Sequence, residues 1–284
     1  MKVLRKLDAL RDFIHSIPPE KSLGLVPTMG ALHEGHLSLV RQSTQQNELT
    51  MVSIFVNPTQ FGPNEDFDQY PRRVAEDAQM LSQLGVDVIF TPDVRDVYPG
   101  AHTYISFHLA ELGDKLCARS RPGHMEGVLQ VVSILFHLTA PTRAYFGLKD
   151  YQQFLIIQKL VSELHFPLEV VPCPIIREKD GLAMSSRNMY LSAEEREQAL
   201  FLSTTLSQLK KNFSSFSTVE DMCTFVAQNL EKFPLVQLDY FEVLDGDSLA
   251  EVQSIPYRGK THAFIAAYLG KTRLIDNMRL SEAI

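Results

Sequence analysis

The chain has 284 residues, of which 45% are hydrophobic, and a formal net charge of −7 at pH 7. This length and composition exclude a disordered chain and allow one large domain or two of moderate size. The negative charge disfavours a broad nucleic-acid surface, which needs a basic face, but it permits a small cationic pocket for phosphates. Cys117, Cys173 and Cys223 form no C-x-x-C pair. That spacing disfavours a disulfide framework or a cysteine-rich zinc site and favours a reducing compartment.

The N-terminal 17 residues predict an amphipathic helix, because apolar residues from Val3 to Ile17 fall on one helical stripe. Charges throughout this segment and the lack of a small-residue cleavage site argue against a secretory signal. No uncharged run in the chain is long enough to span a bilayer. We therefore expect a soluble, cytoplasmic protein without a membrane segment.

Between residues 22 and 174, predicted strands and helices alternate with short connections. The run Leu49–Asn57 is almost continuously apolar, which is typical of a strand buried on both faces of a parallel sheet. The alternation predicts a doubly wound, Rossmann-like α/β sheet. The expected strands are 22–27, 49–57, 86–92, 103–109, 143–147 and 168–174, and the expected helices are 36–47, 72–84, 124–138 and 150–164.

The order of elements changes after about residue 175. Two helices, at 193–211 and 217–232, precede three strands, and this order predicts a separate α+β domain. The expected strands are 236–244, 262–269 and 272–278. We place the boundary just after Pro172 and Pro174, which gives a larger domain over 1–175 and a smaller one over 176–284.

The segment PTMGALHEGHLSL, residues 27–39, places two histidines three residues apart directly after a predicted strand. A zinc-binding H-E-x-x-H helix needs an i, i+4 spacing, so metal binding is disfavoured, and an ordinary helix start remains an alternative. A turn at Gly30 followed by a helix N-terminus offers free N–H groups and the positive end of the helix dipole. Gly35 would let a planar ring approach the backbone. These features favour a phosphate site.

A second stretch, MSSRNMYLS, follows a turn at Gly181. Ser185 and Ser186 offer hydroxyl donors, and Arg187 offers a charged fork suited to phosphate oxygens. Taken alone, the stretch is explained more simply by a helix-capping pair of serines beside a solvated arginine.

Lys149 follows a predicted strand, at the carboxyl edge where open α/β sheets bind ligands. A single lysine at a strand end is usually solvated, so this signal is weaker. Asp150 is expected to cap the next helix. Of Gln152 and Gln153, one can point inward while its neighbour points outward.

Asn57 and Gln60 follow another buried strand at the same edge of the sheet. The long irregular stretch that contains them indicates a functional loop, although a Pro/Gly-rich connection with solvated amides is an equal alternative. Arg121 and His124 precede a helix and predict either a phosphate contact or a simple helix entry.

Together, the H-x-G-H form of His33 to His36 and the later MSSR resemble the adenylate-forming nucleotidyltransferases related to class I aminoacyl-tRNA synthetases. Within that group the chain resembles the pantoate–β-alanine ligase family. The matching segments, in order between residues 27 and 188, are PTMGALHEGHLSLV, SIFVNPTQFGPNEDFDQYPR, RPGHMEGV, RAYFGLKDYQQ and REKDGLAMSSRN. The resemblance implies ATP-dependent ligation of (R)-pantoate and β-alanine to pantothenate, a coenzyme A precursor. The reaction would pass through pantoyl adenylate and release AMP and pyrophosphate.

The resemblance also implies the site. His33 and His36 would donate to phosphate oxygens, with His36 as proton donor, and Lys149 would neutralise phosphates. Gln60 and Gln153 would hold pantoate, and Gln60 would also face β-alanine. ATP would contact Met29, Gly30, Ala31, Leu32, His33, Glu34, Gly35, His36, Gly147, Leu148, Lys149, Asp150, Ile176, Met184, Ser185, Ser186 and Arg187, the last four as a mobile loop. Secondary candidates are Asn57, Tyr70, Arg121 and His124.

The family further implies a homodimer and Mg²⁺ that arrives with ATP, without a dedicated protein metal site. Leu148 departs from the acidic or polar residue common in the family. Two other functions stay open. Another nucleotidyltransferase, which moves an adenylyl or cytidylyl group, would share the histidines but has no evident use for NPTQFG and KDYQQ together. A stand-alone RNA-binding relic of a synthetase is disfavoured by the acidic net charge.

Overall fold

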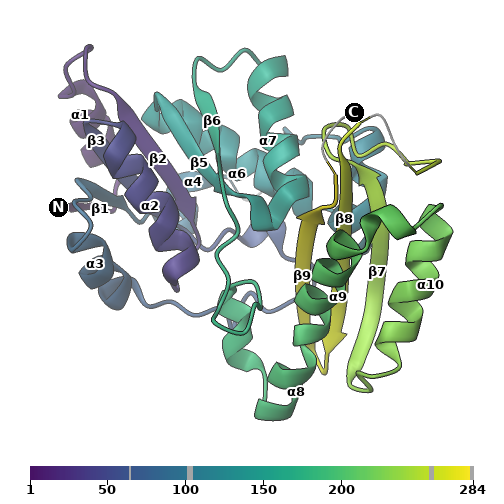
Figure 1. The fold of residues 1–284 in the computed structure, drawn as a ribbon. Coiled ribbons are helices and arrows are strands. Elements are labelled where there is room, and N and C mark those ends of the chain that lie inside the picture. The colour runs from purple at the N-terminus through teal and green to yellow at the C-terminus, as the bar shows by residue number, and fades with distance from the viewer. Residues whose placement is uncertain (64, 101–104, 256–258, 282–284) are drawn as a thin grey trace. The chain divides into compact units, whose positions relative to one another are not determined.

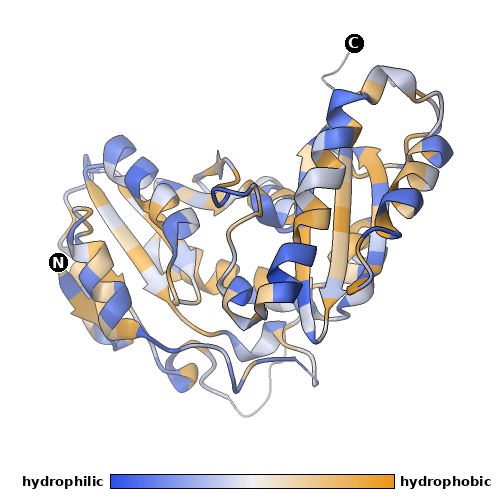
Figure 2. Ribbon diagram, turned by 60° about the horizontal axis from the view of Figure 1, so that its bottom comes forward, coloured by the Kyte–Doolittle hydropathy of each residue, from blue (hydrophilic) through white to orange (hydrophobic). Residues whose placement is uncertain are grey.

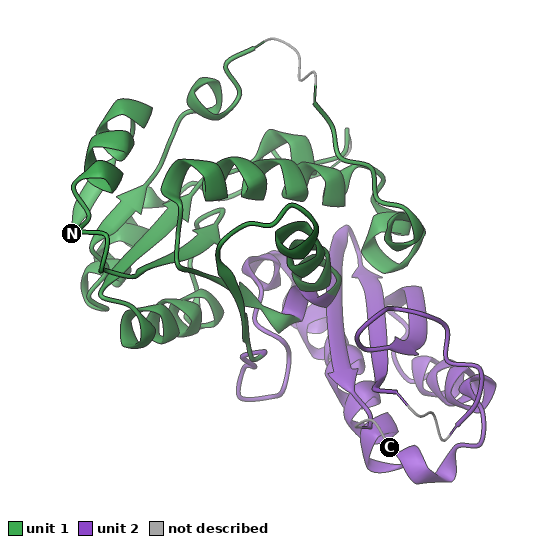
Figure 3. Cartoon of the chain, turned by 90° about the horizontal axis from the view of Figure 1, so that it is seen from above, with its two compact units in different colours: residues 1–148, 152–174 green, residues 149–151, 175–284 purple. Residues whose placement is uncertain are grey.

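The computed structural model describes residues 1–63, 65–100, 105–255 and 259–281. The chain forms two compact units (Figure 3), one of residues 1–148 and 152–174 and the other of residues 149–151 and 175–284. The first unit therefore ends at Pro174, next to the division predicted at residue 175. That prediction takes no account of residues 149–151, which belong to the second unit.

The first unit is built on a six-stranded parallel sheet (Figure 1) in the order β1-β4-β3-β2-β5-β6. This confirms the predicted doubly wound α/β class. The chain runs from β2 towards β3 on one side, and β5 lies on the other side, so the strand order reverses between β2 and β5. The strands are β1 (Lys2–Leu4), β2 (Leu23–Thr28), β3 (Leu49–Ile54), β4 (Val88–Phe90), β5 (Arg143–Gly147) and β6 (Glu169–Cys173).

Helices connect these strands and cover both faces of the sheet. They are α1 (Leu7–His15), α2 (Glu34–Gln46), α3 (Val74–Ser82), α4 (Val94–Val97), α5 (Leu116–Ser120), α6 (His124–Thr139) and α7 (Tyr151–Glu163). Short 3₁₀ turns, η1 (Pro58–Gln60), η2 (Glu111–Asp114) and η3 (Leu148–Asp150), lie in the connections.

Burial on both faces explains the apolar runs in the strands, which are mostly orange in Figure 2. On one face, side chains of α2 and α3 pack against β2, β3 and β4, among them Leu39, Val40, Leu81, Val26, Val52 and Ile89. Tyr145 of β5 belongs to the same cluster, so its neighbour Phe146 points to the opposite face. There it meets Phe136 of α6, with ring centroids 6.4 Å apart. Helices on both faces of the sheet are therefore held by apolar side chains of its strands.

Two predicted elements are wrong. The N-terminal segment is not helical from its start, because residues 2–4 form β1, and Lys2 N donates to Asp87 O at 2.7 Å. Val3 and Leu4 were expected on the helical stripe, but three residues are too few to separate a strand from a helix by period. Residues 105–109 of the strand expected at 103–109 have no regular structure, and residues 103 and 104 lie outside the described ranges.

The second unit contains an antiparallel sheet in the order β7-β8-β9, with helices ahead of it in the chain, as the α+β prediction requires. Its strands are β7 (Val236–Asp245), β8 (Thr261–Leu269) and β9 (Thr272–Arg279). Its helical elements are η4 (Ser186–Tyr190), α8 (Ala193–Gln198), α9 (Leu200–Lys211), η5 (Phe213–Ser215) and α10 (Val219–Leu230). The helix expected at 193–211 is therefore two helices, divided at Ala199.

Apolar side chains from α9, α10 and all three strands form the core of the second unit, among them Phe201, Leu206, Met222, Val243, Ile265 and Leu274. Within the described ranges, no helix of either unit has the length and apolar character needed to cross a membrane.

Candidate functional site

The chain turns sharply where β2 ends, in the left-handed region at Gly30 (φ 82°) and Ala31 (φ 51°). Asp77 of α3 holds this turn, since its carboxylate accepts hydrogen bonds from Ala31 N at 3.0 Å and Leu32 N at 2.8 Å. A Cβ on residue 30 would lie 2.9 Å from Asp77 Oδ2 and from Ile54 Cγ2, so glycine is required twice over.

Sequence reasoning missed Asp77. The residue is 1% exposed, and burial raises the pKa of its carboxyl group, while the two backbone donors lower that pKa. A signal was available: Asp77 lies on the same helical face as Val74 and Leu81, where a buried helix normally carries an apolar residue.

The two histidines cap α2 reciprocally. Gly35 N donates to His33 Nδ1 at 3.1 Å, and His33 N donates to His36 Nδ1 at 3.3 Å. The ring centroids are 4.1 Å apart. Because each Nδ1 accepts, each neutral ring carries its proton on Nε2. The start of α2 thus combines two imidazole donors with the N–H groups and positive dipole of a helix N-terminus, a combination suited to phosphate oxygens.

The side chain of Glu34 is not one of the donors at the start of α2. It forms an exposed ion pair with Arg41, seven residues further along α2, and this hydrogen-bonded pairing lowers the pKa of Glu34. Its contribution to an anion site would come from its backbone N–H in the first turn.

A second group of polar side chains follows β3. Asn57 is 1% exposed, and its amide forms hydrogen bonds within the protein. Nδ2 donates to Gly127 O at 3.0 Å and to Gln60 Oε1 at 3.2 Å, and Oδ1 accepts from Tyr98 OH at 2.7 Å. Gln60 Nε2 lies 2.9 Å from Met29 Sδ. Residues predicted to bind ATP and pantoate therefore adjoin at the carboxyl ends of β2 and β3.

Arg121 and His124 support the main chain of Gln60. His124 Nδ1 lies 2.8 Å from Gln60 O and donates to it, while His124 Nε2 accepts from Arg121 Nη1 at 2.9 Å. The guanidinium also donates to Glu65 Oε1 at 2.7 Å. This network goes beyond a simple helix entry, and Glu65 is a member that sequence reasoning missed. Tyr70, the remaining secondary candidate, is buried with its ring edge-on to Phe61 at 6.0 Å.

Gly147 ends β5, and α7 brings the two glutamines. Gln152 is the inward member, since its amide donates to Leu112 O at 3.0 Å and Lys115 O at 2.9 Å and accepts from Ala118 N at 3.2 Å. Gln153 is half-buried. Gln152 is thus the glutamine that points inward, and its amide is used for hydrogen bonds within the protein.

Leu148 is the last residue of the first unit before the chain enters the second, which carries Lys149, Asp150, Ile176 and the Met184–Arg187 segment. Lys149 Nζ lies 3.6 Å from Asp150 Oδ1. Met184 N donates to Ile176 O at 3.0 Å across a short hairpin that turns at Gly181 (φ 96°). Ser185 Oγ accepts from Arg187 N at 3.3 Å and caps η4, as the simpler interpretation of this stretch required.

Ion pairs hold the hairpin that leads into this stretch. Arg196 of α8 contacts Glu178 at 2.8 Å and Asp180 at 2.7 Å. Asn188 Nδ2 donates to Glu178 Oε1 at 2.7 Å and to Ala183 O at 3.1 Å. The Met184–Arg187 segment therefore has a fixed base. Among the described residues, no group of three or more histidine, cysteine or acidic side chains is arranged to hold a metal ion.

The first unit is therefore an α/β domain in which the predicted site residues between positions 29 and 60 follow the carboxyl ends of β2 and β3, next to the point where the strand order reverses. Such domains bind their ligands at that edge. The particular family follows from comparison: the chain belongs to the pantoate-beta-alanine ligase family, whose model matches residues 2–279. The predicted family, and with it the assignment to a family of enzymes, is confirmed.

Relatives and solved structures agree with this assignment. The chain is 48% identical over 284 residues to a pantothenate synthetase of Pseudothermotoga lettingae, covering 99% of this chain and 100% of that protein. A crystal structure of pantothenate synthetase from Thermus thermophilus is 38% identical, with a TM-score of 0.92 and 99% of each chain covered. A pantoate-beta-alanine ligase from Francisella tularensis, complexed with beta-gamma ATP and beta-alanine, is 34% identical, with a TM-score of 0.83 and coverage of 99% and 98%.

Proposed function

We propose that this chain uses ATP to join pantoate to β-alanine, giving pantothenate, AMP and pyrophosphate. Membership of the pantoate-beta-alanine ligase family supports the reaction. The observation that carries the assignment to this site is the reciprocal capping of His33 and His36, which puts an Nε2–H donor on each ring at the start of α2.

The proposed chemistry has two steps. First, a carboxylate oxygen of pantoate attacks the α-phosphorus of ATP, the bond from that phosphorus to the bridging oxygen breaks, and pyrophosphate leaves with the electron pair. Second, the amine of β-alanine attacks the acyl carbon of pantoyl adenylate, AMP leaves, and the nitrogen loses a proton. A carboxylate becomes an acylating agent only after it acquires a leaving group, which AMP supplies.

The residue roles follow from charge. Negative charge shifts onto the phosphate oxygens as pyrophosphate leaves, and preorganised donors stabilise it best. We assign His36 and His33 as Nε2 donors, Lys149 as a neutralising cation, and Ser186 and Arg187 as further phosphate ligands. The remaining ATP contacts predicted from the sequence are part of the same proposal.

We assign the amides of Gln60 and Gln153 to pantoate. Gln60 suits this role because the Asn57 amide, Arg121 and His124 fix its side chain and its carbonyl. Those three residues are then supports of the site rather than ligands. Mg²⁺ would enter with ATP as part of the substrate. We further propose a homodimer that works in the cytoplasm, which sedimentation and cell fractionation would test.

Pantoate-dependent exchange of labelled pyrophosphate into ATP tests the first step without β-alanine, and AMP release on adding β-alanine tests the second. We expect exchange with pantoate and none with other carboxylates. Exchange independent of pantoate, or adenylyl transfer to a phosphate or amine, would instead indicate a different nucleotidyltransferase. His36→Ala should lower exchange by orders of magnitude in a folded protein, whereas His15→Ala, at the exposed end of α1, should leave it unchanged.

A further inference from the structure

Two adjacent polar residues, Asp276 and Asn277, lie in the middle of β9, a strand that mixes polar and apolar residues. Asp276 is 3% exposed and Asn277 4% exposed, so both are buried on the last strand of the second unit. Buried polar side chains need partners. Each of the two residues has a partner in one of the segments of this unit that carry the proposed nucleotide ligands.

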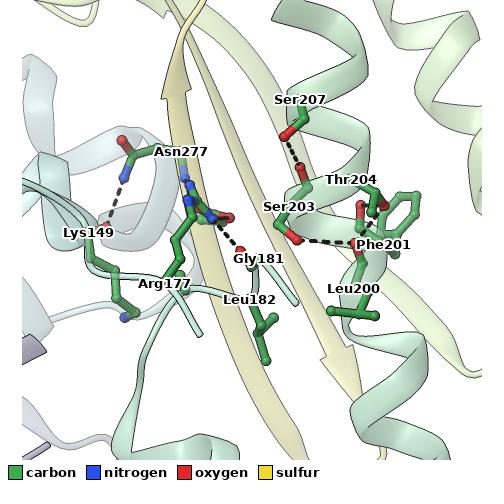
Figure 4. Close-up of polar contacts among 12 residues, drawn as sticks. Lys149, Arg177, Gly181, Leu182, Leu200, Phe201, Ser203, Thr204, Ser207 and Asn277 are labelled. Atoms are coloured by element: carbon green, nitrogen blue, oxygen red, sulfur yellow. Dashed lines mark hydrogen bonds and ion pairs between the residues drawn. The ribbon is translucent and has the colours of Figure 1, made fainter. Parts of the chain in front are cut away.

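Asn277 holds the main chain at Lys149. Its Nδ2 donates to Lys149 O at 2.9 Å (Figure 4), and its Oδ1 lies 2.8 Å from His262 Nε2. His262 of β8 fixes which way the amide points, because a proton on Nε2 requires the oxygen of Asn277 to face the ring and the nitrogen to face Lys149. Burial lowers the pKa of His262 to about 4, so the ring is neutral near pH 7.

Asp276 holds the base of the Met184–Arg187 segment. Its carboxylate accepts from Arg177 Nη1 at 2.7 Å and Nη2 at 2.9 Å, a bidentate pair. Arg177 Nη1 also donates to Gly181 O at 3.0 Å, at the tip of the hairpin (Figure 4). Arg177 and Ala183 pair across this hairpin directly before Met184.

We infer that Asp276 and Asn277 are positioning residues that place Lys149 and the Met184–Arg187 segment correctly for one nucleotide. This inference rests on the proposed function. Both residues stand on one strand that is paired with β8 along its length, so the two segments share a rigid frame. Displacing a substrate-binding group by about 1 Å can cost about a hundredfold in rate, which is why such a frame matters.

The same strand supplies a matched control. Arg273 of β9 pairs with Asp239 of β7 at 2.7 Å, with side chains 13% and 19% exposed. This ion pair links β9 to β7, the strand on the other side of β8. If the polar residues of β9 had only a structural role, losing the Arg177–Asp276 pair would change the kinetics no more than losing the Arg273–Asp239 pair.

The test uses nearly isosteric variants of the full chain in the pantoate-dependent exchange assay. Asn277→Asp places an oxygen where a donor faced Lys149 O, and Asp276→Asn breaks the bidentate pair. For both we expect the KM for ATP to rise about tenfold or kcat to fall about tenfold to a hundredfold, with the KM for pantoate unchanged. Asp276→Glu should recover part of the loss, and Asp239→Asn should leave kcat and the KM for ATP unchanged.

Wild-type values of KM and kcat in both variants, or losses in Asp239→Asn equal to theirs, would overturn the inference. KM does not depend on the fraction of folded enzyme, so partial unfolding does not obscure the comparison. If a β9 variant fails to fold, Arg177→Lys replaces it in the test. This change removes the bidentate guanidinium contact to Asp276 from a partly exposed residue, and the KM for ATP and kcat are compared in the same way. A wild-type chain without pantoate-dependent exchange would refute the proposed function, whereas an active wild type with indifferent variants refutes this inference alone.

Discussion

The buried carboxylate of Asp77 makes a sharp test of how the α2 histidines are held in place. Replacing it with asparagine keeps the shape of the side chain but turns one of its two acceptor oxygens into an NH₂ group. Since Ala31 N and Leu32 N both point at this side chain, the variant can satisfy only one of them. The turn that sets the start of α2 then loses one charge-assisted hydrogen bond.

Such a bond is worth about 1.5–3 kcal/mol. A loss of about 2 kcal/mol in positioning corresponds to a decrease of about 30-fold in kcat/KM for ATP. Stability should change less than activity. Burial already raises the pKa of Asp77, so removing its charge relieves a desolvation cost that partly offsets the lost bond.

Pyrophosphate exchange at varied ATP measures the kinetic effect, and urea unfolding measures stability. Glu76→Gln is the matched control, because Glu76 is the preceding residue of α3, 66% exposed in its side chain, and pairs only loosely with Arg73 at 3.5 Å. We expect the control to stay within about twofold of wild type, since exposed ion pairs contribute little. Equal kcat/KM in Asp77→Asn and the control would refute our account of the turn.

Three further predictions concern the pantoate residues and the buried histidine. Gln60→Ala should raise the KM for pantoate more than that for ATP, and a larger effect on ATP would show that the pocket is mapped incorrectly. Gly127→Ala should do the same, because a Cβ there would lie 2.2 Å from Thr59 O and push η1 away, at a cost of about 1–3 kcal/mol. The lowered pKa of His262, about 4 against the usual 6.5, means that the unfolded chain binds more protons between these values. Stability should therefore fall by about 2 kcal/mol from pH 7 to pH 5, and urea titrations of His262→Gln should lack that part of the decrease.

Much of the fold could be predicted because burial on both faces leaves a strong mark on the sequence. The run from Leu49 can be recognised as an inner parallel strand, since almost every residue of β3 is apolar or buried. β1 could not be recognised in this way. It has three residues at the edge of the sheet, and what makes it a strand is pairing with β4, which lies more than eighty residues further along the chain.

In the candidate site, too, features within one short stretch of sequence could be predicted, and features that depend on distant residues could not. His33, His36 and Gly30 lie in one short string whose spacing already indicates a capped helix start. Asp77 acts on that string from 45 residues away, and only the tertiary structure brings it there. The sequence gives no means of telling Asn57 from Gln60, since both are amides in one loop. In the structure Asn57 donates to Gly127 O of α6 and to the side chain of Gln60, and it therefore supports Gln60. The Asp276–Asn277 pair carried no such signal, because β9 also contains Thr272, Arg273 and Arg279, and only the tertiary structure shows that the pair is buried.

The short β1 also bears on how this protein can be handled in the laboratory. Its pairing covers the edge of β4, whose three residues are all buried. Deleting the first five residues, or straining them with a rigid fusion, would leave unsatisfied β4 backbone groups open to a strand from another molecule. A purification tag is therefore better joined through a flexible spacer, and an N-terminally clipped preparation should be checked for self-association before its kinetics are interpreted.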